Sequence, residues 1–543
     1  MSVETQELTE SIQTQEQPTA HEARHLTRTA SGEILFWRIA ASVLFLAVIA
    51  LVALLFLAKE GLIFQPEVVE EPPVEYTAVC SVPVGDPLIV TGIEGETVTL
   101  PQGPAIDGYT FIGWADAEGE PVRGGAVTLS GNAAFRAVYQ IAFRDESQSG
   151  SHEAYMPLDE SLMFRPREAL TRGEAVELIY AFLDTDSYGS ARFTDVPEDA
   201  SYYRAAATLK DLGVIGGGRL HPQDPITCSE FFEILASFFP VPQNRFRFTA
   251  LSDDDPRCDA FCLAMDKGWI DDVEIDPDRD LTRAEAAHIF NCLSGRAPVA
   301  EDDHAKVGTI YDVSFRDSYF WDIAEACIPH EADRSGDGET WKSSEALELK
   351  EEGFFFIGTA MHCADAEGSA LVNESYGSFD FGSDGVITTG RPELDELVQQ
   401  KLQSLSIDPA TMDREKLLRT VYNDVTYHNK YLRIHYYEIG DTSWIYDEAI
   451  HMLTEGKGNC YNFSSEFYFL VRALGFDAVI YSGTVDPTAA PHAWVEISFD
   501  GVPYIFDTEL EYTQHIKAHK YTSFYKLPYE RVVRWYYVRE KAE

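Results

Sequence analysis

Three residues near the C-terminus have the types and the order of a cysteine nucleophile, its base and its orienting carboxylate. Cys460 follows Gly-Lys-Gly-Asn, His492 lies in Pro-His-Ala-Trp, and Asp507 ends Tyr-Ile-Phe-Asp. A thiolate can attack an acyl carbon, an imidazole can accept and return protons, and a carboxylate can fix the tautomer of that imidazole. This set of side chains predicts acyl chemistry through a thioester.

The local sequence predicts where Cys460 lies. Glycines precede Cys460 at 456 and 458, and apolar residues follow it at helical spacing up to Gly475, namely Phe463, Phe467, Leu470, Val471 and Leu474. We therefore expect Cys460 at a helix N-terminus, where free N–H groups and the helix dipole stabilise a thiolate. The alternative is that Cys460 is a small buried residue without reactivity.

His492 and Asp507 can be placed relative to each other by counting along a hairpin. Residues 492–499 and 502–508 predict two strands joined by a two-residue turn at Asp500-Gly501. If 499 pairs with 502, His492 faces Glu509, and Asp507 is its diagonal neighbour on the same face. We expect Asp507 to bind one ring nitrogen of His492 while the other nitrogen faces Cys460.

This pattern resembles the transglutaminase-like superfamily over residues 395–512. The resemblance rests on Gly458-x-Cys460 before a helix, Trp494 two residues after the histidine, and Phe506-Asp507. It implies a papain-like α+β domain, taken as 393–543, and a cysteine peptidase, amidase or acyltransferase that needs no metal or organic cofactor.

The same resemblance implies further site residues. The backbone N–H of Cys460 would be one oxyanion donor, and an aromatic residue upstream, Trp444 or Tyr446, would shape the second. Trp494 is a further candidate for the oxyanion or substrate site. The alternative function is a non-catalytic binding or scaffold protein of the cell wall with a transglutaminase-like fold. Thiol reactivity distinguishes the two, because a catalytic thiolate reacts at mildly acidic pH.

Composition limits the class of protein. At 543 residues the chain must contain several domains. With 42 basic and 90 acidic residues, its net charge of −48 argues against a nucleic-acid partner. Eight cysteines are too few for a disulfide framework. Cys258 and Cys262 share a helix face, and we interpret them as core residues and not as a metal site.

Residues 39–58 contain no charged side chain. As a helix they would span roughly 30 Å, the thickness of a bilayer core. Arg24, Arg28 and Arg38 precede this run, so the positive-inside rule predicts a cytoplasmic N-terminus and an extracellular C-terminal bulk. A cleaved signal peptide is the rival interpretation, which the length of the run disfavours.

An internal repeat occupies residues 141–296. Thr171, Thr227 and Thr282 each begin a Thr-x-x-Glu sequence, which is typical of a helix capping box. The pattern resembles three S-layer homology repeats, which implies an all-α bundle that binds a cell-wall polymer. Arg172 and Arg283 match the family's glycan-contacting arginine, whereas the middle repeat has cysteine there, so a purely structural spacer is the alternative.

The remaining segments predict accessory modules. Residues 77–140 resemble the Listeria–Bacteroides repeat, a small β-grasp-like module, and 351–392 resemble aromatic-glycine cell-wall-binding hairpins. The expected partners are a peptide or protein substrate, a cell-wall polymer, and a membrane that the chain crosses with one helix. The expected order is a disordered cytoplasmic tail (1–38), a transmembrane helix (39–58), a linker (59–76), the β repeat (77–140), the three helical repeats (141–296), a linker or degenerate repeat (297–350), the hairpins (351–392) and the catalytic domain (393–543).

Overall fold

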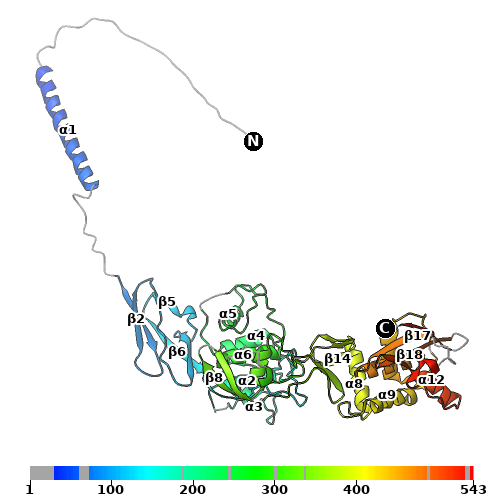
Figure 1. Ribbon diagram of the computed structural model, residues 1–543. Helices are drawn as coiled ribbons and strands as arrows, with labels where there is room; N and C mark the ends of the chain where they lie inside the picture. Colours follow the sequence, from blue (N-terminus) through cyan, green and yellow to red (C-terminus); the bar gives the residue numbers. More distant parts are fainter. Residues whose placement is uncertain are drawn as a thin grey trace, which may run out of the picture. The chain divides into compact units, whose positions relative to one another are not determined.

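The computed structural model has two units, Met1–Val74 and Glu75–Glu543 (Figure 1). It describes residues 30–59, 73–185, 189–242, 246–252, 254–296, 304–335, 338–433, 435–485, 490–531 and 538–541. The expected cytoplasmic tail at 1–29 and the linker at 60–72 lie outside the described residues.

The first unit contains helix α1 (Ala30–Lys59). Its central part, Ala40–Leu57, has a mean hydropathy of 3.0, and none of it is buried. Within the described part of the chain, α1 is the one helix whose length and composition suit a membrane crossing. Helix α1 thus agrees with the run predicted at 39–58 in its length and its composition.

The second unit begins with a small β region. Its main sheet has the order β2 (Leu88–Ile93), β1 (Glu75–Ser81), β6 (Ala133–Ile141) and β4 (Tyr109–Ala115), beside a pair of β3 (Thr97–Thr99) and β5 (Ala126–Thr128). Strands β1 and β6 run parallel. Trp114 is buried in the core of this region, and its indole N–H donates to Pro101 O at 2.8 Å. The short strands expected at 77–140 are therefore present, with Trp114 as a core residue.

Six helices form the next region. They are α2 (Arg172–Phe182), α3 (Tyr203–Asp211), α4 (Cys228–Ala236), α5 (Cys258–Asp266), α6 (Arg283–Ser294) and α7 (Phe320–Cys327). Helices α2, α4 and α6 each begin with the capping box that the sequence predicts, at Thr171, Thr227 and Thr282. One continuous core joins all six helices.

The residues just before the three caps are bonded to one another in a ring. Leu170 N–H donates to Leu281 O, Leu281 N–H donates to Ile226 O, and Ile226 N–H donates to Leu170 O, at 2.7, 2.9 and 2.9 Å. Each repeat thus supplies a backbone donor and an acceptor to its neighbours. The repeats pack as one unit because none of them could satisfy these groups alone.

A three-stranded sheet joins chain segments from the two ends of the helical region. Strand β7 (Gly150–His152) precedes the first repeat, while β8 (His330–Ser335) and β9 (Gly338–Ser344) follow the third. Helix α7 and Trp341 belong to the same core as the repeats. The segment expected to be a linker or degenerate repeat therefore contributes helix, strand and core.

Hairpins follow at 353–388. They contain β10 (Gly353–Ile357), β11 (Ala360–Ala364), β12 (Ser375–Tyr376), β13 (Phe379–Phe381) and β14 (Ile387–Thr388). Arg472 of the C-terminal domain lies over the Phe379 ring at 4.6 Å and donates to the Ser378 carbonyl. The hairpins therefore contact that domain directly.

The C-terminal domain has helices packed on one antiparallel sheet. The helices are α8 (Pro392–Ser404), α9 (Arg414–His428), α10 (Ile445–Glu455), α11 (Cys460–Arg472) and α12 (Thr508–Tyr512). The sheet order is β20 (Leu527–Pro528), β19 (Val502–Phe506), β18 (Ala490–Phe499), β17 (Ala478–Val485) and β21 (Val538–Lys541). A small parallel pair, β15 (Lys430–Tyr431) and β16 (Lys457–Gly458), precedes α11. The remaining short elements lie in several regions of the chain and are η1 (Arg123–Gly125), η2 (His304–Lys306), η3 (Thr513–Lys517) and η4 (Tyr529–Arg531).

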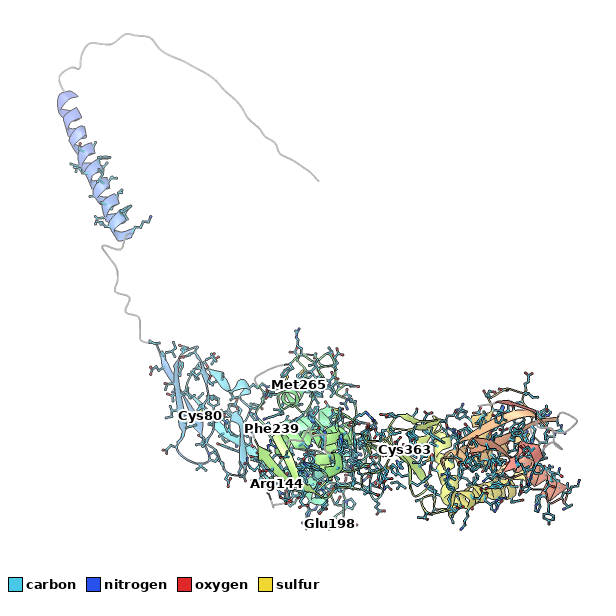
Figure 2. All side chains as sticks on the ribbon, in the orientation of Figure 1. Cys80, Arg144, Glu198, Phe239, Met265 and Cys363 are labelled. Atoms are coloured by element: carbon cyan, nitrogen blue, oxygen red, sulfur yellow. The ribbon has the colours of Figure 1, made fainter. Side chains whose placement is uncertain are left out.

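All eight cysteines are free, and seven of them are buried. Cys80 lies in the core of the β region and Cys363 in that of the hairpins (Figure 2). Cys258 and Cys262 lie in the helical core, as interpreted from the sequence. Cys292 is exposed, so it is the reference thiol for any labelling experiment.

Candidate active site

Cys460 is the first residue of helix α11, as the sequence predicts. Asn459 caps the helix, because its side-chain oxygen accepts from Tyr461 N at 3.1 Å, while Asn462 Oδ1 accepts from Asn459 N at 3.0 Å. Gly458 allows this geometry, since a Cβ at this position would lie 2.3 Å from Asn462 Cγ. The turn therefore fixes Cys460 where the N–H groups of the first helical turn have no intrahelical acceptor.

The hairpin that carries His492 has the predicted register. Phe499 pairs with Val502, and the turn residues Asp500 and Gly501 have φ of 51° and 76°. The return strand ends earlier than expected, at Phe506 instead of 508. The reason is that Asp507 caps α12, with Oδ1 accepting from Leu510 N at 2.9 Å, and aspartate is a preferred residue at this position.

The structure brings the three predicted residues together. His492 Nε2 lies 2.7 Å from Asp507 Oδ2, and the side chains of His492 and Cys460 hydrogen bond to each other. All three side chains are buried. Because Asp507 occupies Nε2, the nitrogen left for the thiol is Nδ1.

The electrostatics of the site favour an imidazolium. Burial alone would lower the pKa of His492, but the charges of Asp507 and Cys460 and their hydrogen bonds outweigh it and raise this pKa well above its ordinary value. A protonated imidazole beside a sulfur stabilises the thiolate form of that sulfur. The geometry thus suits an ion pair between Cys460 and His492.

Glu509 is a further residue of the site. Its Oε2 lies 4.0 Å from His492 Nδ1, and Thr513 Oγ1 donates to its other oxygen at 2.5 Å. Burial raises the pKa of Glu509, and the nearby charge of His492 opposes that rise. Counting along the hairpin placed Glu509 opposite His492, but the sequence alone gave no reason to assign it a role.

The aromatic residues expected to shape the site lie in different places. Trp494 is buried on β18, with its ring 6.4 Å from that of His492 and nearly parallel to it. Trp444 packs edge-on against Tyr461, beside Cys460, and its indole N–H donates to Asp441 O. The indole N–H of Trp444 is therefore already hydrogen bonded to the backbone, and Trp444 contacts Tyr461 with the ring itself.

Tyr446 is set apart from the triad. It lies under Arg391, with the guanidinium 4.5 Å from its ring, and lines a cavity of about 200 Å³. Gln399 of α8 and Arg472 of α11 line the same cavity, whereas Cys460 does not.

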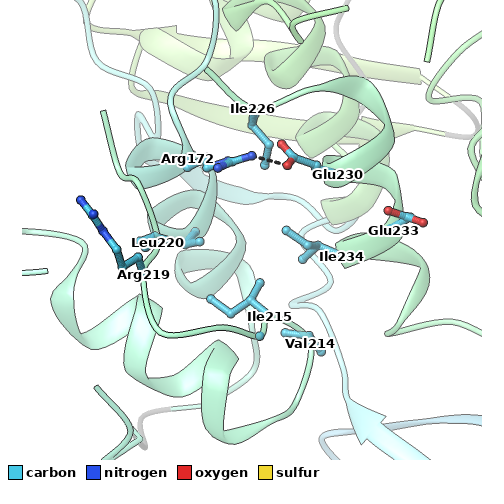
Figure 3. Close-up of a pocket in the computed structure, with 11 residues that line it drawn as sticks. Arg172, Val214, Ile215, Arg219, Leu220, Ile226, Glu230, Glu233 and Ile234 are labelled. Carbon is cyan, nitrogen blue, oxygen red and sulfur yellow. Dashed lines mark hydrogen bonds and ion pairs between the residues drawn. The ribbon is translucent and has the colours of Figure 1, made fainter. Parts of the chain in front are cut away.

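Arg172, the first of the two predicted glycan contacts, lies at a boundary between repeats. It pairs with Glu230, the capping glutamate of the second repeat (Figure 3). A cavity of about 330 Å³ opens beside this pair and is lined also by Arg219 and Ile234. The cavity holds charged and apolar side chains together, which suits a polar ligand with an apolar face.

Arg283 occupies the corresponding position between the third and first repeats. It pairs with Glu174 at 2.5 Å, beside a cavity of about 460 Å³. At the remaining boundary, where Cys228 replaces the arginine, Arg279 reaches Glu285 at 2.5 Å. The expected loss of the cation there is compensated from a different backbone position.

Comparisons with known families agree with this architecture. Residues 407–507 match the model of the transglutaminase-like superfamily, and residues 192–232 match that of the S-layer homology domain. The chain therefore contains a transglutaminase-like domain and S-layer homology sequence. No curated protein matches the chain.

Several solved structures are similar to part of the chain. A candidate cysteine protease from Cytophaga hutchinsonii is 20% identical over 21% of this chain and 37% of its own, with a TM-score of 0.17. Calcium-bound LapG from Legionella pneumophila is 13% identical over 26% of this chain and 78% of its own, with a TM-score of 0.19. An arylamine N-acetyltransferase from Bacillus cereus is 17% identical over 21% and 48%, with a TM-score of 0.15.

Proposed function

We propose that the chain is a membrane-anchored cysteine enzyme of the cell surface that cleaves or transfers peptide or amide acyl groups through a thioester. Cys460 is the nucleophile, His492 the general base and acid, and Asp507 the residue that orients His492. The observation that carries this proposal is the buried 2.7 Å bond from Asp507 to His492, whose ring also binds the Cys460 side chain. Transglutaminase-like sequence over 407–507 supports the reaction class.

The reaction would proceed in two halves. The Cys460 thiolate adds to the carbonyl carbon, and the resulting oxyanion is stabilised by N–H groups at the start of α11, including that of Cys460. His492 then gives its proton to the leaving nitrogen as the C–N bond breaks, which leaves a thioester. Water or an amine, deprotonated by His492, attacks the thioester and releases Cys460.

Activity profiling tests this proposal. The full-length chain and its Cys460→Ala variant are compared on wall peptides and on denatured proteins, with and without an added primary amine. Cys292→Ala is the matched control, because Cys292 is exposed and its sulfur lies 3.7 Å from His288 Nε2, a second cysteine–histidine contact. We expect turnover in wild type and in Cys292→Ala and none in Cys460→Ala. Equal turnover in all three would refute the catalytic role of Cys460.

A non-catalytic binding protein is the alternative, and the thiol itself separates the two functions. Cys460 is buried, so as a structural residue it would resist alkylation in the folded chain. As a nucleophile paired with His492, it should react with iodoacetamide at mildly acidic pH. Slow labelling of Cys460, together with peptide binding and no turnover, would favour the binding protein.

A second proposed activity is the binding of a cell-wall polymer by the helical repeats. The cavities beside Arg172 and Arg283 support it, and so does the S-layer homology match. Arg172→Ala with Arg283→Ala should weaken retention of the chain by isolated cell walls. Arg257→Ala is the control, because Arg257 pairs with Asp255 and Asp278 and lines neither cavity. Undiminished retention of the double variant would reject the arginine roles.

The proposed topology has one membrane crossing at α1, with the C-terminal bulk outside. The apolar helix and the arginines before it support this orientation. Protease added to intact cells should remove the chain beyond about residue 60, the end of the helix. Protection of the transglutaminase-like domain in intact cells would contradict the orientation.

A further inference from the structure

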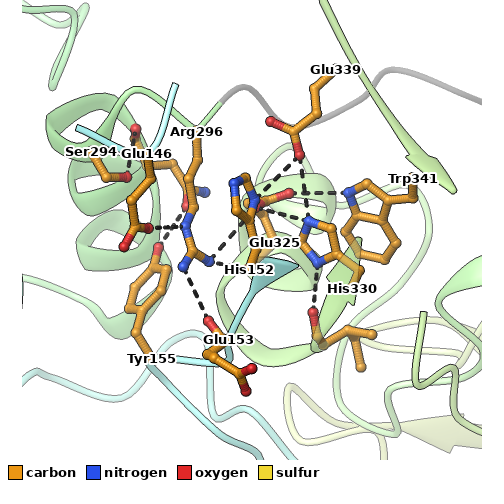
Figure 4. Close-up of polar contacts among 12 residues, drawn as sticks. Glu146, His152, Glu153, Tyr155, Ser294, Arg296, Glu325, His330, Glu339 and Trp341 are labelled. Carbon is orange, nitrogen blue, oxygen red and sulfur yellow. Dashed lines mark hydrogen bonds and ion pairs between the residues drawn. The ribbon is translucent and has the colours of Figure 1, made fainter. Parts of the chain in front are cut away.

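A second cluster of reactive side chains lies in the helical region, apart from Cys460. It consists of His152 on β7, Glu325 on α7, His330 on β8 and Glu339 on β9 (Figure 4). One nitrogen or oxygen from each residue lies within 4.8 Å of the others, and all four residues are buried. Burying two imidazoles and two carboxylates costs free energy unless these groups pair with one another or bind a metal ion.

Three of the four distances in this cluster are close to those between the ligands of a tetrahedral metal ion, while the shortest, from His152 to Glu325, is that of a hydrogen bond. His152 Nδ1 lies 2.8 Å from Glu325 Oε1 and 3.5 Å from Glu339 Oε1. His330 Nε2 lies 3.2 and 3.4 Å from the same two oxygens. Metal bonds of about 2.0–2.2 Å in tetrahedral geometry place neighbouring ligand atoms roughly 3.3–3.6 Å apart.

The tautomer of His330 is fixed by its other ring nitrogen. Nδ1 lies 2.8 Å from Ile328 O, and because a carbonyl oxygen only accepts, Nδ1 must carry a proton. A neutral His330 therefore directs the lone pair of Nε2 into the cluster. Trp341 stacks on this ring at 3.9 Å and holds its orientation.

The carboxylates are oriented in the same way. Trp341 Nε1 donates to Glu325 Oε2 at 3.1 Å, and Arg334 donates to Glu339 Oε2 at 3.2 Å. Each glutamate thus uses Oε2 for an outer donor and presents Oε1 to the centre. Outer partners of this kind, on imidazole and carboxylate alike, are typical around metal ligands.

The local charges are compatible with a divalent cation. A neutral His152 and His330 around a 2+ ion carry the same total charge as two imidazolium rings. Burial alone would lower the pKa of His152, but hydrogen bonds to Glu325 and Glu339 raise this pKa to about 9. Protons can therefore occupy the centre when metal is absent, and metal binding must displace them.

A second arginine, besides Arg334, lies next to the cluster, and its charge is compatible with a metal ion. Arg296 Nη1 lies 3.7 Å from Glu325 Oε1, and Glu146 offsets its charge through a contact of 2.7 Å to Nε (Figure 4).

We propose that His152, Glu325, His330 and Glu339 bind a divalent transition-metal ion, with Zn²⁺ as the first candidate. Two imidazole nitrogens and two carboxylate oxygens suit Zn²⁺, and four protein ligands leave no open position for chemistry. The site is structural, because its ligands come from β7, before the first repeat, and from α7, β8 and β9, after the third. The ion ties the two ends of the helical region together.

Metal return to the stripped chain tests this proposal. The full-length chain, purified in detergent, carries Cys460→Ala so that the thiol beside His492 cannot bind metal. It is stripped with a chelator and dialysed against Zn²⁺, and metal content and melting temperature are measured. We expect one Zn²⁺ per chain and a melting temperature several degrees higher, because the ion binds the folded state alone. Co²⁺ in its place should give the strong visible absorption of tetrahedral coordination.

Variants locate the ion. His330→Gln and Glu339→Gln should lose it, whereas His288→Gln should keep it, because His288 pairs with Asp322 elsewhere in the same helical region. Trp341→Phe keeps the ring beside His330 but removes the donor to Glu325. It should weaken Zn²⁺ binding roughly 10–100-fold even where a ligand variant fails to fold.

Two results would overturn the proposal. One is that the stripped chain takes up no Zn²⁺ and its melting temperature does not change. The other is that His330→Gln or Trp341→Phe binds one equivalent as tightly as the parent chain. In either case the four residues form an ion-pair cluster held by protons.

Discussion

Replacement of Asp507 by asparagine tests the proposed site most directly, because the two side chains have almost the same shape. Asparagine keeps an oxygen for Leu510 N, now 2.9 Å from Oδ1, so α12 retains its cap. What is lost is the charge 2.7 Å from His492 Nε2, in a position with no solvent exposure. The variant therefore changes the electrostatics of His492 with little change in packing.

The size of the effect follows from this bond. A hydrogen bond to a charged group contributes about 1.5–3 kcal/mol, and one pKa unit corresponds to about 1.4 kcal/mol. The pKa of His492 should fall in Asp507→Asn, because the carboxylate no longer stabilises the charged form of the ring. The Cys460 thiolate then loses its imidazolium partner, so alkylation of Cys460 should require a higher pH. Turnover should fall about 10–100-fold, and further if asparagine selects the wrong tautomer of His492.

Alkylation measures this shift without knowledge of the substrate. Wild type and Asp507→Asn react briefly with iodoacetamide across a pH series, and mass spectrometry of peptides follows each thiol. Exposed Cys292 is the internal reference and should be labelled to the same extent in both proteins. The same midpoint for Cys460 in both proteins would refute the argument that Asp507 acts through His492.

Three further predictions concern stability and pH. Thr227→Ala removes the hydroxyl of the Thr227–Glu230 capping box and should lower the free energy of unfolding by about 1 kcal/mol, measured by denaturant titration. An unchanged unfolding midpoint would show that the packing of the three repeats does not depend on this cap. Gly458→Ala places a Cβ against the buried Asn462 side chain and should cost roughly 1–3 kcal/mol and slow Cys460 alkylation, whereas wild-type melting and labelling would contradict that crowding. The folded-state pKa of His492 is raised, so its stabilising contribution is complete below about pH 6.5, the unfolded value, and is lost as pH rises through the folded value. Because the folded-state pKa is raised, the alkaline limb of kcat/KM should also lie well above about pH 6.5. A limb near pH 6.5 would exclude an imidazolium partner for the thiolate.

The parts of the site that are local in sequence could be predicted from it. Glycines before Cys460 and apolar residues after it specify a helix start, and the structure begins α11 at Cys460. A two-residue turn fixes hairpin register, and Phe499 pairs with Val502 as counted. Both predictions succeed because neighbouring residues determine the backbone geometry in a cap and in a tight turn.

Other features could not be predicted, either because a helix cap competes with the strand pattern or because distant segments meet. Asp507 ends its strand early because its side chain caps α12, which the strand pattern alone does not indicate. Tyr446 precedes Cys460 closely in sequence, yet it lines a cavity with Arg472 on another part of α11. The His152 and Glu339 side chains meet across nearly two hundred residues, and no spacing rule for metal ligands covers that separation.

The three capping boxes show how one side chain can serve two purposes. In the first repeat, Glu174 uses Oε2 to accept from the Thr171 backbone and hydroxyl, while its Oε1 accepts from Arg283 of the third repeat. The same carboxylate thus caps its own helix and joins a neighbouring repeat. An arginine directly after the capping threonine therefore has a structural role in this fold.

The middle repeat supports this interpretation. Cys228 cannot supply a charge, and its burial raises the pKa of its thiol to about 12. Arg279 nevertheless places its guanidinium on Glu285, and the pair is bidentate, with distances of 2.5 and 3.0 Å. The fold thus keeps a cation on each of the three capping glutamates, even where the sequence motif has lost it. Arg172 and Arg283 reach a glutamate of a neighbouring repeat, whereas Arg279 lies six residues before Glu285 in the same repeat, so what the three pairs share is a cation on the capping glutamate. The role in polymer binding proposed for Arg172 and Arg283 would come in addition to this shared one.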